Sequence, residues 1–399
     1  MASGGSRSSL ATDKHARGSG TGSYDGVVIA APDVLVERAR ERVGMSDLGP
    51  DGWQDGLERL VAAVASGIGD DDAAARIETI VLDRLATRLR VEAWYAEHAA
   101  EATHPVERPL VIVGLPRTGT TALHHLLATD SRFRCLRSWE VKDPVPPPEL
   151  ADEACDPRRP GEAPLPDVRH ITTVDGPVED GPIHGLDFRV AELILPVPEY
   201  TAWWRTARHT TAFDYHERIL RMLDSGRPPA RWLLKYPAYL FQLRDVVARY
   251  PTARFVMIHR DPVAALPSTC STILDSREKR LPGWPTDHRW LGTQTLEHWI
   301  DGMHRALDAR EDLGEQRFID IGQHEVELDP VGTAQRVYDF AGLDLRADVR
   351  RGIGRWAAEN RRGARGEHQY RAADFGLVDE EIRRAFAEYL DRFGRYCFP

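Results

Sequence analysis

A short strand, a tight loop and a helix follow one another near residue 110, and this unit constrains the fold more than any other part of the chain. Leu110–Val113 is an apolar run rich in β-branched side chains, which is typical of a strand buried on both faces. Residues 114–119 contain two glycines and a proline and predict a tight loop. Thr120–Ala128 predicts a helix. Because such strands belong to parallel sheets covered by helices, the unit predicts an α/β fold.

Two further strand–helix units follow later in the chain. Trp232–Leu234 predicts a short strand, and Leu240–Arg249 predicts the helix after it. Arg254–His259 predicts another strand. Asp261-Pro262 then predicts the start of a helix, because aspartate is a favoured N-cap and proline is favoured in the first turn. Together the units predict a central parallel sheet.

The segments around these units suggest how the chain is organised. Residues 1–24 are rich in Gly, Ser and charge and predict a disordered tail. Residues 25–107 repeat apolar side chains at helical spacing and predict an N-terminal helical segment. The main domain is expected over 108–399 and to end in an amphipathic helix, 379–393. Residues 145–182 are dominated by Pro, Gly and acidic residues and predict an irregular loop or lid.

The loop before the first helix has the composition of an anion-binding site. Successive backbone N–H groups at the start of a helix form a cradle for an anion, and Gly119 lets the backbone approach closely. Thr120 and Thr121 add hydroxyl donors, and Arg117 adds a permanent charge. The alternative is a strand–helix turn without a ligand. The positions after Gly119 are both threonine, so the lysine of nucleoside-triphosphate loops is missing, and ATP hydrolysis is not predicted.

Composition excludes several other classes of protein. The net charge of −10 argues against a nucleic-acid partner. The four cysteines lack CxxC spacing, so neither a disulfide framework nor a metal site is predicted. The sequence shows neither a signal peptide nor an apolar run long enough for a transmembrane segment. We therefore expect a cytoplasmic protein.

The loop resembles the 5′-phosphosulfate loop of sulfotransferases that use 3′-phosphoadenosine 5′-phosphosulfate (PAPS). That loop reads PKSGTT or PRSGTT in the family, and here it reads Pro116-Arg-Thr-Gly-Thr-Thr121. The resemblance is to a bacterial branch and implies a P-loop-like, three-layer sulfotransferase fold with PAPS as donor and 3′-phosphoadenosine 5′-phosphate (PAP) as product. It also implies that Arg260 and Ser268 bind the 3′-phosphate. The residues that the resemblance assigns to the donor are Arg117, Thr118, Gly119, Thr120, Thr121, Arg260, Ser268 and, in a segment similar to RKGxxG, Arg361, Arg362 and Gly363.

The resemblance also suggests catalytic residues. Sulfonate transfer needs a cation for the charge on the bridging oxygen and a base for the acceptor's proton. Arg117 and Lys235 are the candidate cations, and the transfer requires no metal. In the cytosolic branch the catalytic histidine follows the lysine by two positions, where this chain has Pro237. A branch with arginine in the first loop has a glutamate shortly after the first helix, and Glu140 matches it.

Glu140 could instead cap a helix or pair with a neighbouring basic residue. In that case another group has to be the base. Glu179-Asp180 is the second choice and His170 the third. Asp175 and His184 lie in or beside the same proline-rich segment.

The acceptor is less well defined than the donor. Tyr200, Trp203, Trp204, Phe213 and Tyr215 are spaced so that they could line an apolar pocket or pack as core. The sequence thus predicts in-line transfer of a sulfonate group to a hydroxyl of a small, hydrophobic acceptor, such as an alcohol, phenol, lipid or natural product. The alternatives are a nucleotide-dependent kinase and a non-catalytic nucleotide-binding protein of the same fold. A homo-oligomer is compatible with all three functions.

Overall fold

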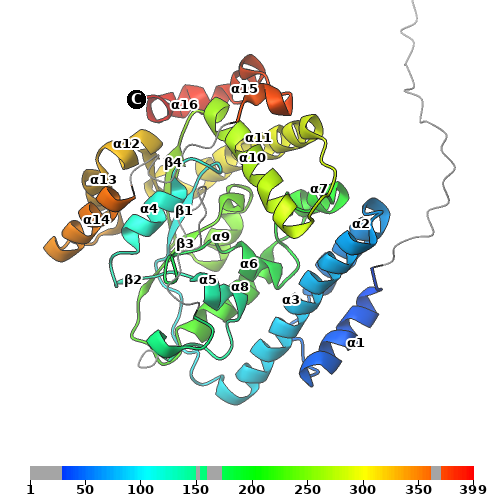
Figure 1. Ribbon diagram of the computed structural model, residues 1–399. Helices are drawn as coiled ribbons and strands as arrows, with labels where there is room; N and C mark the ends of the chain where they lie inside the picture. The colour runs from blue at the N-terminus through cyan, green and yellow to red at the C-terminus, as the bar shows by residue number, and fades with distance from the viewer. Residues whose placement is uncertain (1–28, 150–152, 160–172, 361–369) are drawn as a thin grey trace, which may run out of the picture.

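The strand predicted at Leu110–Val113 is the central strand of a five-stranded parallel sheet (Figure 1). The structure is a computed structural model that describes residues 29–149, 153–159, 173–360 and 370–399. The strand order is β2-β3-β1-β4-β5, and every neighbouring pair is parallel. The strands are β1 (Leu110–Val113), β2 (Phe133–Arg134), β3 (Arg231–Lys235), β4 (Arg254–His259) and β5 (Phe318–Gly322).

Helices cover both faces of the sheet and give the molecule three layers (Figure 1). Side chains of β1 alternate between two separate hydrophobic clusters, Val111 and Val113 in one and Leu110 and Ile112 in the other. On the second face pack α4 (Thr120–Leu127), α12 (Gln323–Leu328), α13 (Pro330–Ala341) and α14 (Ala347–Glu359). The first face is covered by α8 (Thr210–Leu223), α9 (Leu243–Arg249), α10 (Pro262–Arg280), α11 (His288–Leu313) and α16 (Ala387–Cys397).

The N-terminal helical segment consists of α1 (Pro32–Val43), α2 (Trp53–Gly67) and α3 (Asp71–His98). The fully buried Arg88 of α3 ties this layer to the main domain. Its guanidinium donates hydrogen bonds to the carbonyls of Leu48 and Pro50, both at 3.0 Å, and to that of Leu186 at 3.2 Å. Each donor nitrogen has an acceptor, and Oδ1 of the buried Asp187 lies 3.5 Å from Nη1 as a counter-charge.

Several predicted elements have different bounds in the structure. The helix predicted over Leu240–Arg249 is a 3₁₀ turn at Pro237–Phe241 followed by α9. The C-terminal helix is split into α15 (Asp379–Ala385) and α16. The strands β2 and β5 were not predicted. The remaining elements are α5 (Ser138–Lys142), α6 (Gly181–Gly185), α7 (Pro198–Thr206) and short 3₁₀ turns at Glu153–Cys155, Glu315–Arg317 and Ala372–Phe375.

Parts of two predicted segments lie outside the described residues. These are the tail, 1–24, and residues 150–152 and 160–172 of the expected lid. The described part of that lid holds one 3₁₀ turn, the start of a short helix at Gly181 and an isolated bridge between Arg137 and Pro177. Among the described residues, no helix combines the length and the apolar character that crossing a membrane requires.

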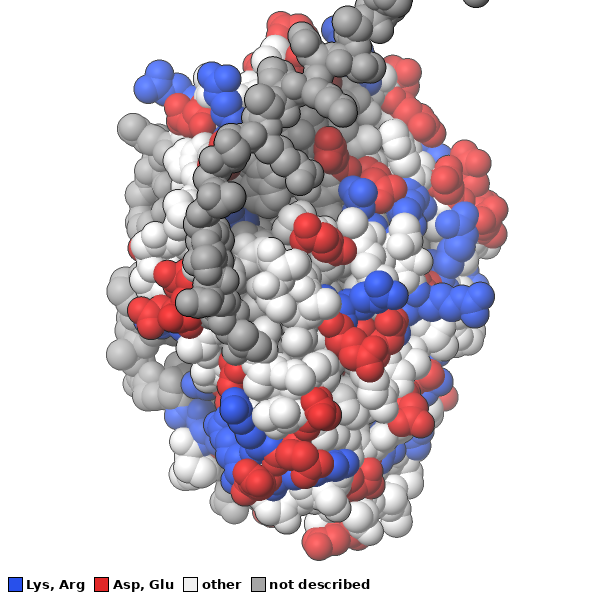
Figure 2. Space-filling view, turned by 90° about the vertical axis from the view of Figure 1, so that its right-hand side faces the viewer, with Lys and Arg blue, Asp and Glu red and all other residues white. Residues whose placement is uncertain are grey.

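Charged side chains of both signs are intermixed over the face shown in Figure 2. Ion pairs such as Arg38–Glu78 and Arg42–Asp83 join α1 to α3. Neither sign dominates this face, so attraction of an anion has to come from a local group of cations.

Gly114 permits the sharp exit of the chain from β1. Its φ is +151°, and a Cβ atom there would lie 2.5 Å from the carbonyl oxygen of Ile258 in β4. Backbone in a sheet cannot move away as a flexible side chain can, so a larger residue would push β1 and β4 apart.

We predict that Gly114→Ala lowers the free energy of unfolding by about 1–3 kcal/mol or more, the usual cost of overpacking. The matched control is Gly394→Ala within α16, where a Cβ meets nothing within 4 Å and alanine favours the helix. Urea denaturation of both variants measures the difference. Equal stability of the two would show that the contact with Ile258 is easily relaxed.

Candidate active site

The carboxyl ends of four strands lie side by side at one edge of the sheet. The loop after β1, Lys235 at the end of β3, Arg260 after β4 and Gln323 after β5 therefore share this edge. In open parallel sheets, ligands bind outside the carboxyl ends of the strands, where the strand order reverses. The order here reverses at β1, because β3 lies on one side of it and β4 on the other.

The loop after β1 is held in an unusual backbone conformation. Arg117 has a φ of +66°, which costs a non-glycine residue about 1 kcal/mol, and Gly119 has a φ of +89°. The buried hydroxyl of Thr118 donates to the carbonyl of Leu115 at 2.7 Å, so this side chain braces the loop rather than facing a ligand. The loop leads directly into the N-terminus of α4 at Thr120, where backbone N–H groups favour an anion.

Three of the residues assigned to the donor form one hydrogen-bonded group. The Nε of Arg117 donates to Oγ of Ser268 at 3.1 Å. The Nη1 of Arg260 donates to the backbone carbonyl of Arg117 at 2.6 Å. Residues from the loop, the end of β4 and the buried side of α10 are thus brought together across more than 140 positions of sequence.

Lys235 connects this loop to a carboxylate. Its side chain is only 3% exposed, and its Nζ donates to Oγ1 of Thr121 at 3.1 Å. The same Nζ lies 2.6 Å from Oε1 of Glu179, whose side chain is 43% exposed. The ammonium group therefore bridges α4 and the segment before α6.

Glu140 has a different environment from the one that a base requires. The side chain is fully buried and forms ion pairs with Arg134 and Arg137. Its Oε2 also accepts from the backbone N–H of Arg137 at 3.1 Å, at the start of α5. Burial alone would raise the pKa of Glu140, but the two arginines outweigh it and hold the pKa at about 2. This geometry argues for a structural role and against Glu140 as the base.

The other candidate bases are also distinguished by their surroundings. Burial raises the pKa of Asp180 to about 8, and its carboxylate accepts from the hydroxyl of Tyr239 at 2.7 Å. Asp175 forms an ion pair with Arg159. His184 is buried among aromatic rings, and this burial places its pKa well below the usual range. His170 lies outside the described residues, as do Arg361, Arg362 and Gly363.

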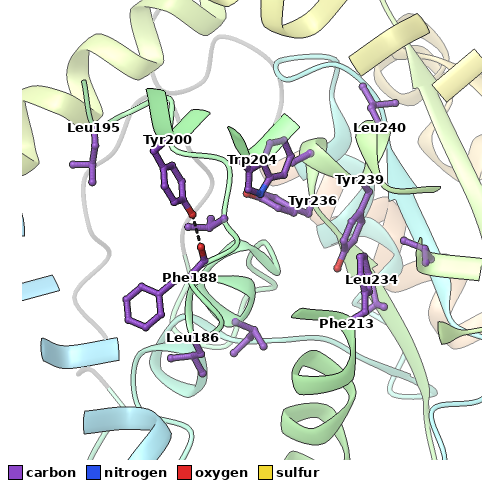
Figure 3. Close-up of a cluster of buried hydrophobic side chains, with 14 of the residues drawn as sticks. Leu186, Phe188, Leu195, Tyr200, Trp204, Phe213, Leu234, Tyr236, Tyr239 and Leu240 are labelled. Carbon is purple, nitrogen blue, oxygen red and sulfur yellow. Dashed lines mark hydrogen bonds between the residues drawn. The ribbon is translucent and has the colours of Figure 1, made fainter. Parts of the chain in front are cut away.

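The aromatic residues proposed for the acceptor pocket are mostly core residues (Figure 3). Tyr200, Trp204, Phe213 and Tyr215 are each at most 3% exposed. The Tyr200 hydroxyl donates to the carbonyl of Phe188, and Nε1 of Trp204 donates to that of Arg189 at 3.0 Å. The second interpretation, packing against the sheet, is the one that the geometry favours.

Sequence reasoning missed Gln323. A Cβ at Gly119 would lie 3.0 Å from its Cγ, so Gln323 stands beside the loop. It follows β5, which the sequence pattern did not predict, and no motif marks it.

We predict that Glu140→Gln destabilises the protein by about 3–5 kcal/mol at neutral pH, because it removes the nearer counter-charge of the buried Arg134 and leaves only Asp224, at 4.0 Å. The folded-state pKa of Glu140 lies below the ordinary value of 4.5, so its contribution is complete above about pH 4.5 and is lost as the pH falls toward about 2. Denaturation experiments between pH 2 and 7 should therefore show that the stability of the variant falls less steeply with decreasing pH than that of the unmodified protein. The exposed Glu97 offers a control, and its glutamine variant should change stability by less than about 0.5 kcal/mol.

Comparison with known proteins identifies the family of the chain. The sequence profile of the sulfotransferase family matches residues 109–347. The omega-hydroxy-beta-dihydromenaquinone-9 sulfotransferase Stf3 of Mycobacterium tuberculosis is 26% identical over 309 residues, which cover 72% of this chain and 75% of that protein. The crystal structure of sulfotransferase STF9 from Mycobacterium avium aligns with a TM-score of 0.82 and 29% identity over 92% of this chain and 97% of that one. Sulfotransferase STF1 from Mycobacterium tuberculosis aligns with a TM-score of 0.77 and 26% identity over 91% of this chain and 100% of that one. With its profile match covering more than half of its length, the chain belongs to the sulfotransferase family and is a sulfotransferase enzyme.

Proposed function

We propose that this sulfotransferase transfers the sulfonate group of PAPS to a hydroxyl of a small, hydrophobic acceptor. The observation that carries the proposal is the meeting of Arg117, Arg260 and Ser268 beside Lys235 at the carboxyl edge of the sheet. A donor with a phosphate at each end needs two anion sites. The loop and the N-terminus of α4 suit the 5′-phosphosulfate, and the Arg260–Ser268 group suits the 3′-phosphate.

The charge that develops on the leaving group would be stabilised by cations that are already in place. PAPS supplies an activated sulfonate whose bond to phosphate breaks during transfer. Lys235 can stabilise the negative charge that then develops on the bridging oxygen. Because its side chain is 3% exposed, its field is weakly screened by water. Arg117 is the second cation, and its hydrogen bond to Ser268 fixes the direction of the guanidinium.

Glu179 is the proposed base. Its carboxylate lies 2.6 Å from Nζ of Lys235, and its side chain is open enough for an acceptor to reach it. The acceptor oxygen would lose its proton to this carboxylate as it forms a bond to sulfur, while the bond from sulfur to the bridging oxygen breaks. With Glu179 as the base, catalysis does not need a histidine two positions after Lys235, where this chain has Pro237.

The nature of the acceptor is suggested by a relative. The Stf3 proteins are sulfotransferases for a hydroxylated dihydromenaquinone, which is a hydrophobic molecule with a terminal hydroxyl. We infer an acceptor of this class, a lipid-like or quinone-like alcohol, for this chain.

The proposal is tested by incubating the protein with ³⁵S-labelled PAPS and a panel of isoprenoid alcohols, hydroxylated quinones, sterols, phenols and sugars. We expect labelled product from a hydrophobic alcohol, unchanged by a chelator of divalent ions. The Lys235→Ala variant should reduce turnover by about 10²–10³-fold because it removes charge stabilisation. Binding of PAP without turnover on any acceptor would instead favour a non-catalytic protein.

A second experiment distinguishes the two glutamates. We predict that Glu179→Gln lowers kcat by about 10²–10⁴-fold, the usual contribution of a general base, while donor affinity changes little. Glu140→Gln, assayed at a temperature where it is folded, should keep most of its rate per folded molecule. The assignment is wrong if the rates are the reverse of these.

A further inference from the structure

Asp180 and Lys235 bind each other through two hydrogen bonds. The backbone N–H of Asp180 donates to the carbonyl of Lys235 at 3.1 Å. In return, Oδ2 of Asp180 accepts from the backbone N–H of Lys235 at 3.1 Å. The aspartate thus satisfies both backbone groups of the last residue of β3, where the strand leaves the sheet.

Tyr239 holds this carboxylate from a second direction. Its hydroxyl donates to the same Oδ2 at 2.7 Å. Since that hydroxyl proton points to Asp180, Nε2 of His184, 3.2 Å from the Tyr239 oxygen, has to be the donor of the next hydrogen bond. Tyr239 and His184 are fully buried, and Figure 3 shows Tyr239 beside Leu234 and Phe213. Tight packing of this kind fixes the side chains that carry the hydrogen bonds.

The carboxyl group of Asp180 is neutral at pH 7. It is 1% exposed, and burial raises its pKa to about 8, so the protonated form predominates below that pH. Oδ2 accepts two hydrogen bonds, while Oδ1 has no hydrogen-bond partner among the described residues and can carry the proton. A neutral Asp180 does not compete with Glu179 for the Lys235 ammonium.

We propose that Asp180 and Tyr239 are positioning residues that fix the backbone of Lys235 and so hold its ammonium between Thr121 and Glu179. Neither touches the reacting atoms. They act through Lys235, whose Nζ is the group placed at the transfer site, and the importance of this placement for catalysis rests on the proposed function above.

The sequence makes Lys235 directly observable. The chain has only four lysines, Lys14, Lys142, Lys235 and Lys279. A protein labelled with ¹³C and ¹⁵N in lysine alone therefore gives at most four Nζ signals, and the one missing in Lys235→Arg belongs to Lys235. We expect this signal to be displaced from the other three and its protons to exchange slowly with water. The measurement needs neither donor nor acceptor.

The variants separate geometry from charge and from general stability. Asp180→Ala should move the Lys235 signal toward that of an exposed lysine and lower kcat on the order of 100-fold, as expected for a displaced catalytic group. Tyr239→Phe should do the same to a smaller extent, about tenfold. Asp180→Asn should retain the signal and most of the rate, because its carbonyl oxygen can accept both hydrogen bonds. Donor affinity should change less than twofold in all three.

Asp187 provides the matched control, since it is another 1%-exposed aspartate of the same segment but binds Thr211 and Arg189. Asp187→Asn should lower stability and leave the Lys235 signal in place. The proposal is overturned if Asp180→Ala and Tyr239→Phe lower stability with the Lys235 signal unmoved, or if Asp180→Asn loses the signal as fully as Asp180→Ala. If Asp180→Ala does not fold, the Lys235 signals of Tyr239→Phe and Asp180→Asn decide whether the proposal holds. Absence of sulfonate transfer in the unmodified protein would refute the proposed function and leave the NMR result valid.

Discussion

The close contact between Gly114 and β4 determines where the rest of the site can form. β1 and β4 are paired in parallel up to Val113 and Met257, and at the next position, Gly114, an added Cβ would lie 2.5 Å from the Ile258 carbonyl oxygen. A chain that leaves the sheet so close to β4 enters the loop beside Arg260 and α10. The hydrogen bonds from Arg117 to Ser268 and from Arg260 to Arg117 follow from this path. The grouping of these cations is thus a consequence of backbone packing as much as of charge.

Local pairing explains how an acidic protein can provide a cationic site. The net charge is −10, yet Arg117, Arg260 and Lys235 gather at one sheet edge. Arg117 donates to the Ser268 hydroxyl, Arg260 to a backbone carbonyl and Lys235 to the Thr121 hydroxyl. Neutral acceptors of this kind orient a cation without cancelling its charge. Lys235 also contacts the carboxylate of Glu179, which we propose as the base.

The sequence was informative where the signal was local. β1 and β4 have the predicted bounds, and the Asp261 cap forms, because a buried strand and a helix start are encoded within a few adjacent residues. β2 has only two residues and no periodicity to detect, and the C-terminal helix breaks at Phe386 although the apolar spacing continues through it. The aromatic residues after position 200 show the same limit. Their spacing fits a pocket and a core equally well, and only the sheet packed against them determines which one forms.

The two glutamates show why a candidate base cannot be chosen from its distance along the chain. Glu140 lies near Arg117 in sequence, but the arginines that matter are Arg134 and Arg137, which fix its carboxylate in the ionised, fully bonded form. A carboxylate with all its lone pairs engaged and no access to solvent has little capacity to take a proton. Glu179 is followed directly by Asp180, whose bonds to Lys235 depend on a strand more than 50 residues later. The pairing of strand and loop, which is non-local, is what brings Glu179, the proposed base, to Lys235.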